Sequence, residues 1–349
     1  MAHAGARTRR DFFVHLSGGL GGLLGLWFAG CQSTVPPPKV TTPAPSHEPL
    51  ALEPLHGLAI GAGLRWIVLA KPQDLAHHPA LATGVARLAP PLRRRVFLQL
   101  TGIDLDAIQQ LVVAGYDRSV LFLMDGIKDP LVSEETFRDR LVRDMTRTAY
   151  RPDAVWTHGK TAAGDVRAFA AMPPNVVAVE GGDTFRSKVA LLLALGRLRR
   201  SPRALDLPDM KTVLDELGDG AVQALAPGPF LGEWENALGG LLRVTSVLGA
   251  RVRVTDDGSM DLAVRLAGSW GDDATHASTI LLDRWFEIAR SPVGRLLHLQ
   301  KPLVEPSVSD RADMIALDVR LDGVRLVDGL HDAVAADLGD ILDLGDATR

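Results

Sequence analysis

The stretch Arg251–Leu266, RVRVTDDGSMDLAVRL, carries the clearest structural signal in this chain of 349 residues. Charged and apolar side chains alternate from Arg251 to Thr255, which is the period of a half-buried strand. Asp256-Asp257-Gly258 follows, and residues of these types form tight turns. The alternation then resumes from Met260 to Leu266. The sequence therefore predicts an antiparallel β-hairpin at residues 251–266.

The segments around this hairpin complete the second half of the chain. Residues 221–225 and 313–320 have the apolar or alternating pattern of strands. Residues 231–246, 272–290 and 324–337 carry apolar side chains at helical spacing. The second half is therefore predicted to combine strands and helices.

The first half shows the same kinds of signal. The run Arg65–Ala70 predicts a buried strand that ends at Pro72. Residues 73–100 predict a helix that is broken at Pro90-Pro91, because proline interrupts helical hydrogen bonding. Further strands are predicted at residues 111–116, 120–124, 155–158, 166–172 and 176–180, and a further helix at residues 184–199.

One more helix is predicted over residues 133–149. Ser133 is expected to be its N-cap, since a serine side chain accepts hydrogen bonds from the first free backbone N–H groups. Glu134 and Glu135 would then occupy the first turn, where carboxylates interact favourably with the helix dipole.

Each half thus reads as strand, helix, hairpin, helix, strand, with a further helix after it. That order is typical of the ferredoxin-like, split β-α-β unit. We therefore predict an α+β protein with two tandem ferredoxin-like (β-α-β-β-α-β) units, at residues 57–203 and 204–349. The predicted repeat depends on element order, because sequence identity between the halves is slight.

The amino-terminal segment has the pattern of a signal peptide. Arg7, Arg9 and Arg10 form a positive region, and Phe12–Gly30 is an apolar run without a charged residue. The many glycines in this run make it a poor membrane-spanning helix, although a permanent membrane anchor is the alternative interpretation. Cys31, the one cysteine of the chain, follows directly.

Two motifs in this segment resemble those of exported bacterial lipoproteins. TRRDFF, Thr8–Phe13, is similar to the twin-arginine export motif, with Phe13 where leucine is more usual. FAGC, Phe28–Cys31, resembles a lipobox, with phenylalanine again replacing the usual leucine. The resemblance covers residues 1–31 and implies export through Arg9 and Arg10.

The same resemblance implies how the mature protein begins. Residues 1–30 would be the signal peptide, cleaved after Gly30, and Cys31 would carry the lipid that anchors the protein in a membrane. In the enterobacterial sorting pattern, a residue other than aspartate after the cysteine, here Gln32, favours the outer membrane over the inner membrane. The body is then expected in the periplasm.

Residues 31–56 contain the lipidated cysteine and a proline-rich linker. Pro36-Pro37-Pro38 and four further prolines lie among serines and threonines, a composition that favours extended, solvated backbone. We interpret the segment as a tether, with a proline-rich recognition motif as the alternative.

Composition limits the function classes. The net charge of −4 argues against a dedicated nucleic-acid binder, which would carry a concentrated basic face. A single cysteine excludes disulfides within the chain. The chain must therefore be stabilised by its apolar core.

Several short motifs were weighed as sites. Gly61-Ala62-Gly63 precedes a strand and lacks the third glycine of a dinucleotide loop, and His77-His78 has no carboxylate at helical spacing. The acidic repeat Asp337–Asp346 suggests a solvated tail or, alternatively, calcium ligands, and the basic cluster Arg197–Arg203 suggests capping or contact with anionic envelope components. We assign no catalytic residue, metal or cofactor.

The sequence thus predicts a lipid-anchored protein of the bacterial envelope with a non-catalytic binding or scaffold role. Its partners would be the membrane, through the lipid, and another envelope protein or component, but no nucleic acid. An exported enzyme with an unrecognised site is one alternative. The other is a carrier that holds an apolar ligand between its two units, which an apolar cavity of several hundred cubic ångströms would favour.

Overall fold

The structure is a computed structural model that describes residues 49–198 and 201–343, with side chains described as far as Ala333. Its strands are β1 (Leu64–Ala70), β2 (Gln110–Tyr116), β3 (Ser119–Asp125), β4 (Arg143–Ala149), β5 (Val155–Lys160), β6 (Val166–Met172), β7 (Val176–Gly182), β8 (Val222–Pro227), β9 (Thr245–Val254), β10 (Ser259–Gly268), β11 (Val304–Arg311) and β12 (Met314–Asp322).

Helices fill five of the eleven connections between the described strands. The α-helices are α2 (Pro72–Ala76), α3 (Ala82–Leu88), α4 (Pro91–Thr101), α5 (Pro130–Arg140), α6 (Arg186–Ala194), α7 (Met210–Leu217), α8 (Ala274–Arg290), α9 (Pro292–Leu296) and α10 (Gly323–Asp343). The 3-10 helices are η1 (Leu55–Leu58), η2 (Leu105–Ala107), η3 (Ala204–Asp206), η4 (Gly232–Arg243) and η5 (Gly271–Asp273).

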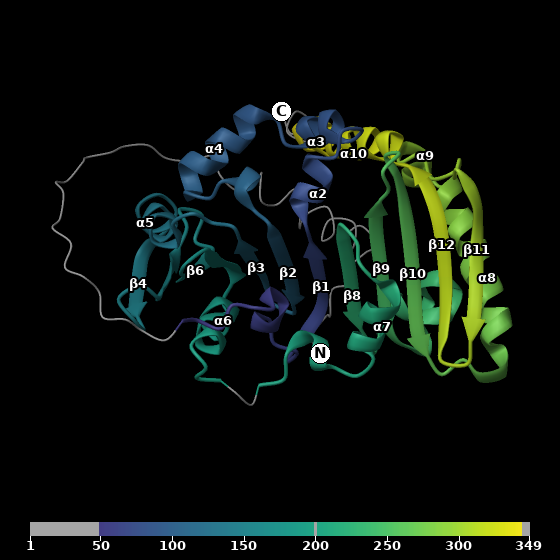
Figure 1. Ribbon diagram of the computed structural model, residues 1–349, viewed down its shortest axis with the longest axis horizontal. Coiled ribbons are helices and arrows are strands. Elements are labelled where there is room, and N and C mark those ends of the chain that lie inside the picture. The colour runs from purple at the N-terminus through teal and green to yellow at the C-terminus, as the bar shows by residue number, and fades with distance from the viewer. Residues whose placement is uncertain (1–48, 199–200, 344–349) are drawn as a thin grey trace, which may run out of the picture.

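All twelve strands of the described residues form one sheet, in the order β11-β12-β10-β9-β8-β1-β2-β3-β7-β6-β5-β4 (Figure 1). The predicted hairpin is confirmed as β9 and β10, with Arg253 directly opposite Asp261. Its turn closes through a hydrogen bond from Thr255 N to Ser259 O, and Gly258 takes the positive φ of 81° that the turn requires.

The mixed α+β composition is confirmed, but two tandem ferredoxin-like units are not. A split β-α-β unit contains a parallel pair of strands, because its crossover connection returns the chain in the same direction. Here every neighbouring pair is antiparallel. The element order was read correctly in outline, but it did not determine which strands pair.

The two halves nevertheless share one connectivity. From the centre of the sheet outward, the first half has the order β1, β2, β3, β7, and the second half has the order β8, β9, β10, β12. In each half, three consecutive strands are thus followed by the last strand of that half. The halves meet where β1 pairs with β8, so the sheet continues across the boundary predicted at residues 203 and 204. Arg87 of α3 also donates to Asp328 of α10 at 3.0 Å, which links helices from the two halves at one end of the strands (Figure 1).

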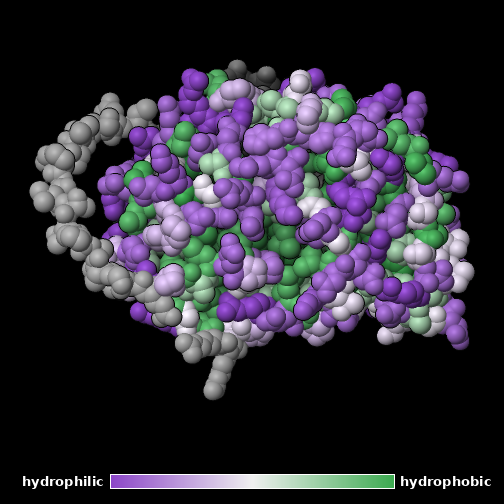
Figure 2. All heavy atoms as spheres, viewed as in Figure 1, coloured by the Kyte–Doolittle hydropathy of each residue, from purple (hydrophilic) through white to green (hydrophobic). Residues whose placement is uncertain are grey.

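Helices pack on both faces of the sheet. Helices α6 and α7 pack on one face, over a core that includes Ile67 and Leu225. On the other face, α8 packs on β11 and β12, and α5 packs on β6. On the face drawn in Figure 2, apolar side chains reach the surface near the middle. Most of the margin of this face is hydrophilic.

The helix predicted at residues 133–149 is wrong in both its start and its end. The N-cap is Asp129, whose side chain accepts from Leu131 N and Val132 N, and α5 ends at Arg140. The remainder of the predicted helix is the edge strand β4. Ser133 is buried within α5 and donates to Gly102 O instead.

Two other helical predictions need correction. Residues 73–100 break at Pro90-Pro91 as predicted, but also between α2 and α3. Residues 231–246 form η4, which is interrupted by non-helical backbone at residues 237–240, before β9 begins at Thr245. Helix α7 and strand β11 were not predicted.

The last residues of the predicted linker belong to the folded body. Ala51 N donates to Ala194 O at 2.9 Å, and Leu50 and Leu52 pack on the core beside α6. Leu55 is only 3% exposed. The tether of the sequence prediction is therefore shorter than residues 31–56, since Leu50, Leu52 and Leu55 already belong to the body.

Candidate functional site: a pocket between the two halves

A pocket of about 480 Å³ lies where the two halves of the chain meet. We call it the junction pocket. Its lining comes from the start of β1, the connection between η3 and α7, the end of β8 with the residues after it, and the step from η4 into β9. Its volume falls within the 300–1,000 Å³ that is typical of ligand pockets, and it is an open groove on the surface, not an enclosed cavity.

Most of its walls are apolar. The apolar side chains of the lining are those of Leu64, Leu207, Pro208, Pro227, Pro229 and Val244. Three of these six are prolines, whose rings fix φ and leave the backbone little freedom. The pocket therefore has preformed walls.

Glycine allows the chain to close around the pocket. A Cβ on Gly61 would lie 3.0 Å from Arg203 O and from the Leu207 side chain, and a Cβ on Gly228 would lie 2.8 Å from Thr245 O. Both glycines line the pocket. The lining segments approach one another more closely at these two points than a larger residue would allow.

The two hydroxyl groups of the lining already donate their protons to the protein. Thr245 Oγ1 donates to Leu241 O at 2.9 Å. Ser246 Oγ donates to Asp209 Oδ2 at 2.6 Å, the shorter of its two contacts. Each hydroxyl proton is thus committed, so these side chains offer a ligand only acceptor capacity.

Arg243 supplies the charge of the pocket. Its Nη2 donates to the neutral amide oxygen of Asn236 at 2.5 Å. Within the described part of the chain, no carboxylate lies within ion-pair distance of this guanidinium. An exposed arginine with most of its donors free thus lies at the border of an apolar pocket.

The rim of the pocket is also apolar. Val244, in the lining, is 50% exposed. Leu231 and Trp234 are outside the lining; they follow Pro229 in sequence, with Trp234 within η4, and are 65% and 36% exposed. Apolar side chains of this size are normally buried, so this part of the surface is suited to contact with another molecule.

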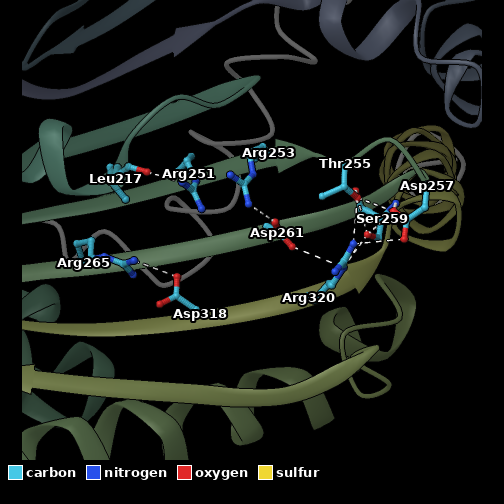
Figure 3. A network of polar contacts seen from close by, with 10 residues as sticks. All are labelled: Leu217, Arg251, Arg253, Thr255, Asp257, Ser259, Asp261, Arg265, Asp318 and Arg320. Carbon is cyan, nitrogen blue, oxygen red and sulfur yellow. Dashed lines mark hydrogen bonds and ion pairs between the residues drawn. The ribbon is translucent and has the colours of Figure 1, made fainter.

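A second polar feature is the charged face formed by Arg251, Arg253, Asp261, Arg265, Asp318 and Arg320 on β9, β10 and β12 (Figure 3). Asp261 is the direct cross-strand neighbour of both Arg253 and Arg320. Arg253 Nη2 lies 2.6 Å from one Asp261 oxygen, and Arg320 Nε lies 3.7 Å from the other. Arg265 pairs with Asp318 at 3.0 Å. Most charges of this face therefore neutralise one another.

The hairpin turn is fixed to the same face. Asp257 accepts from Thr255 Oγ1 at 2.5 Å and from the backbone and side chain of Ser259, and these hydrogen bonds hold its pKa far below the ordinary value. Arg320 lies 3.3 Å from the same carboxylate. The ionised Asp257 thus ties the turn to β12 (Figure 3).

Arg251 is the exception on the charged face. Its Nη1 donates to Leu217 O at 2.5 Å, and its Nε is buried without a partner. Burial lowers the pKa of Arg251, and the guanidinium groups of Arg253 and Arg265 lower it further. This arrangement binds α7 to the sheet, so we interpret the charged face as structural.

Two carboxylates are fully buried, and both have a complete set of donors. Glu134 accepts from Thr157 Oγ1 at 2.5 Å and from Arg147 Nε at 3.2 Å. Glu180 accepts from Ser187 N at 2.9 Å and from the hydroxyls of Ser187 and Thr184. These contacts anchor α5 and α6 to the sheet.

The residues singled out in the sequence fall in different places. Arg9, Arg10, Gly30 and Cys31 lie outside the described residues. Gly61, weighed as part of a dinucleotide loop, lines the junction pocket.

Three of the described tryptophans are buried. Trp156, Trp270 and Trp285 are at most 6% exposed, as expected for core residues. Among residues 49–198 and 201–343, no tryptophan lines the junction pocket.

Sequence reasoning missed the pocket residues. Pro208, Pro227 and Pro229 were not among the candidate residues, and Arg243 falls within the helix predicted at residues 231–246. The one local signal was the cluster of prolines and glycines at residues 226–229, which indicates an irregular connection but not its neighbours.

Two kinds of feature are absent from the described residues. In residues 49–198 and 201–343, no helix combines the length and apolar character that crossing a bilayer requires. In the same residues, no three histidine, cysteine, aspartate or glutamate side chains are grouped as ligands for a metal ion.

Comparisons with known proteins gave two structural matches. No protein-family model matches the chain, and no curated protein matches its sequence. Crystal form IV of TP0453 is similar in structure, with a TM-score of 0.45 and 12% identity, over 82% of this chain and 97% of TP0453. Crystal form I of the same protein has a TM-score of 0.43 and 12% identity, over 82% of this chain and 98% of TP0453.

Proposed function

We propose that this chain is a lipid-anchored protein of the bacterial cell envelope, with a folded body that has a non-catalytic binding role. The observation that carries the proposal is the order of three signals. The arginine pair Arg9-Arg10, the apolar run to Gly30 and the single cysteine Cys31 follow one another at the spacing of an exported lipoprotein.

In this proposal the lipid holds the protein and the body does the binding. Leu50 packs on the core of the body, and the proline-rich segment before it would link the acylated cysteine to the body. Stable anchoring requires more than one acyl chain, which the triacylated terminus of bacterial lipoproteins provides. The outer membrane is the proposed destination, and another envelope component is the proposed partner.

The test is metabolic labelling of producing cells with a fatty-acid probe, followed by membrane fractionation. We expect the parent chain to be labelled and to fractionate with membranes. Cys31→Ser should lose both properties, whereas Ser33→Ala, a change two residues away, should keep them. Equal labelling of the parent and Cys31→Ser would contradict the proposal.

The junction pocket favours a second candidate function, that of a carrier. The pocket is mostly apolar, has a volume of about 480 Å³ and lies between the halves of the chain. These are the properties expected of a protein that holds an apolar ligand. Native mass spectrometry of the protein purified from its membranes tests this candidate, because a carrier would retain a small molecule in substoichiometric or full amount.

A further inference from the structure

We infer that the junction pocket binds a compact amphiphile that has an apolar body and one acidic group, with the acidic group held by Arg243. The inference rests on the carrier function proposed above and specifies the ligand class of that site. Three observations carry it: the composition of the walls, the position of the free charge, and the arrangement of the remaining polar groups.

The walls select an apolar body. Leu64 and Leu207 lie in the lining, with the ring of Pro208 beside Leu207, the rings of Pro227 and Pro229 on a further segment, and Val244 half-exposed. A ligand ring or short chain in this space removes apolar surface from water on both partners, which is the main source of affinity in such pockets. Because proline restricts the walls before binding, less conformational freedom is lost on association.

The charge selects an acidic group. Arg243 is the one charged side chain among the residues that line the pocket. Its partner is the neutral amide of Asn236, so its charge is not compensated by a carboxylate within the described residues. A guanidinium presents paired N–H donors that match a carboxylate or a similar oxyanion.

The remaining polar groups orient the ligand. Ser246 and Thr245 have committed their protons, so neither can donate to an oxyanion. The Asp209 carboxylate stands behind Ser246 and would repel a negative group placed there. The acidic group is therefore directed to Arg243, and the apolar body to the leucine and proline walls.

The test measures two fluorescent probes of similar shape. One is 8-anilinonaphthalene-1-sulfonate, which has an apolar body and one anionic group, and the other is N-phenyl-1-naphthylamine, which lacks the sulfonate. Both are titrated by equilibrium dialysis into the full chain carrying Cys31→Ser, so that no attached acyl chain competes. Every variant carries the same amino terminus, which makes binding to that segment a constant background.

Three variants on this background separate the contributions. Arg243→Gln removes the charge, and Arg93→Gln removes an exposed arginine from α4 in the other half as the matched control. Val244→Trp fills the pocket from its exposed rim. Circular dichroism melts confirm that each variant is folded.

We expect Arg243→Gln to weaken binding of the anionic probe about tenfold or more and to leave the neutral probe unchanged, as for the loss of a charge-assisted hydrogen bond. Arg93→Gln should change neither, and Val244→Trp should weaken both. Unchanged anionic binding in Arg243→Gln, or unchanged binding of both probes in Val244→Trp, would overturn the inference. Because acylation is absent throughout, this outcome is independent of whether Cys31 is lipidated.

Discussion

Ile67 on β1 lies directly opposite Leu225 on β8, and this pair joins the two halves of the chain into one sheet. Ile67 is 0% exposed and Leu225 is 1% exposed. Both belong to the core that α7 covers. The halves are therefore expected to fold as one cooperative unit, although the sequence suggested two.

Leu225→Ala tests this cooperativity. Truncation of a fully buried leucine leaves a cavity and should lower the free energy of unfolding by about 2–5 kcal/mol. Urea denaturation followed by tryptophan fluorescence should give a single transition, because Trp156 and Trp270 report on different halves. Leu92→Ala, at a position that is 69% exposed, is the control and should change stability by less than about 0.5 kcal/mol. Two transitions, with only one shifted by Leu225→Ala, would show that the halves unfold separately.

Glu134→Gln should destabilise the protein by about 1–3 kcal/mol, because it removes a buried carboxylate that accepts from Thr157 and Arg147. The adjacent Glu135 is the matched control, since its side chain is 63% exposed. Glu135→Gln should cost less than about 0.5 kcal/mol. The comparison uses thermal and urea unfolding of both variants, and equal effects would mean that Glu134 is not buried as described.

Asp261→Asn should lower stability by roughly 1 kcal/mol, because Arg253 and Arg320 both lose the carboxylate between them. Asp117→Asn, which removes the partner of Arg65, should cost less, since both side chains of that pair are about 60% exposed. Unfolding is measured at low and high salt. If the charged face is structural, Asp261→Asn should still destabilise the protein more than Asp117→Asn at high salt. If the two variants become equally stable at high salt, the contacts of Asp261 are ordinary surface ion pairs that salt screens.

Tyr116 should make stability fall at alkaline pH. Burial raises the pKa of Tyr116 from 10.0 to about 12, although the positive charge of Arg186 lowers it. The unfolded chain loses this proton from pH 10, whereas the folded chain keeps it to about pH 12. The stabilisation is therefore complete below pH 10 and declines between these values.

The pKa itself is measured in Tyr150→Phe, which leaves Tyr116 as the single tyrosine of a chain that has two. Tyrosinate absorbance should titrate with a midpoint near 12 while circular dichroism shows the native fold. A midpoint near 10 in the folded protein would contradict the buried position of this ring.

The central strands could be predicted because burial leaves a local signal. The strand predicted at residues 65–70 matches β1 closely, and the hairpin predicted at residues 251–266 matches β10 and the second half of β9, which begins six residues earlier, at Thr245. Their side chains face an apolar core on at least one side, which gives alternating or continuous apolar runs. This signal depends on each segment alone, so the sequence contains it.

The two edge strands were missed for the same physical reason. β4, RDMTRTA, is exposed along almost its whole length, and β11, VEPSVSDR, has one fully buried residue, Pro306. Neither strand has a buried face that would impose a period of two. Charges and proline at a sheet edge discourage pairing with other chains, but they also remove the pattern by which strands are recognised.

Local sequence patterns could not predict which strands pair or where the junction pocket forms. Element order is compatible with several arrangements, and the antiparallel joint between β1 and β8 depends on contacts between residues far apart in the chain. The pocket likewise combines Leu64 with Arg243 and with the prolines between them in sequence. No single segment contains more than a part of it.

The most direct test of the central claim is the mass of the amino-terminal peptide of the protein purified from membranes. Anchoring predicts that this peptide begins at Cys31 and carries the added mass of a diacylglycerol and an amide-linked acyl chain. A mature protein that begins at another residue, or one whose Cys31 is present and unmodified, would contradict the account.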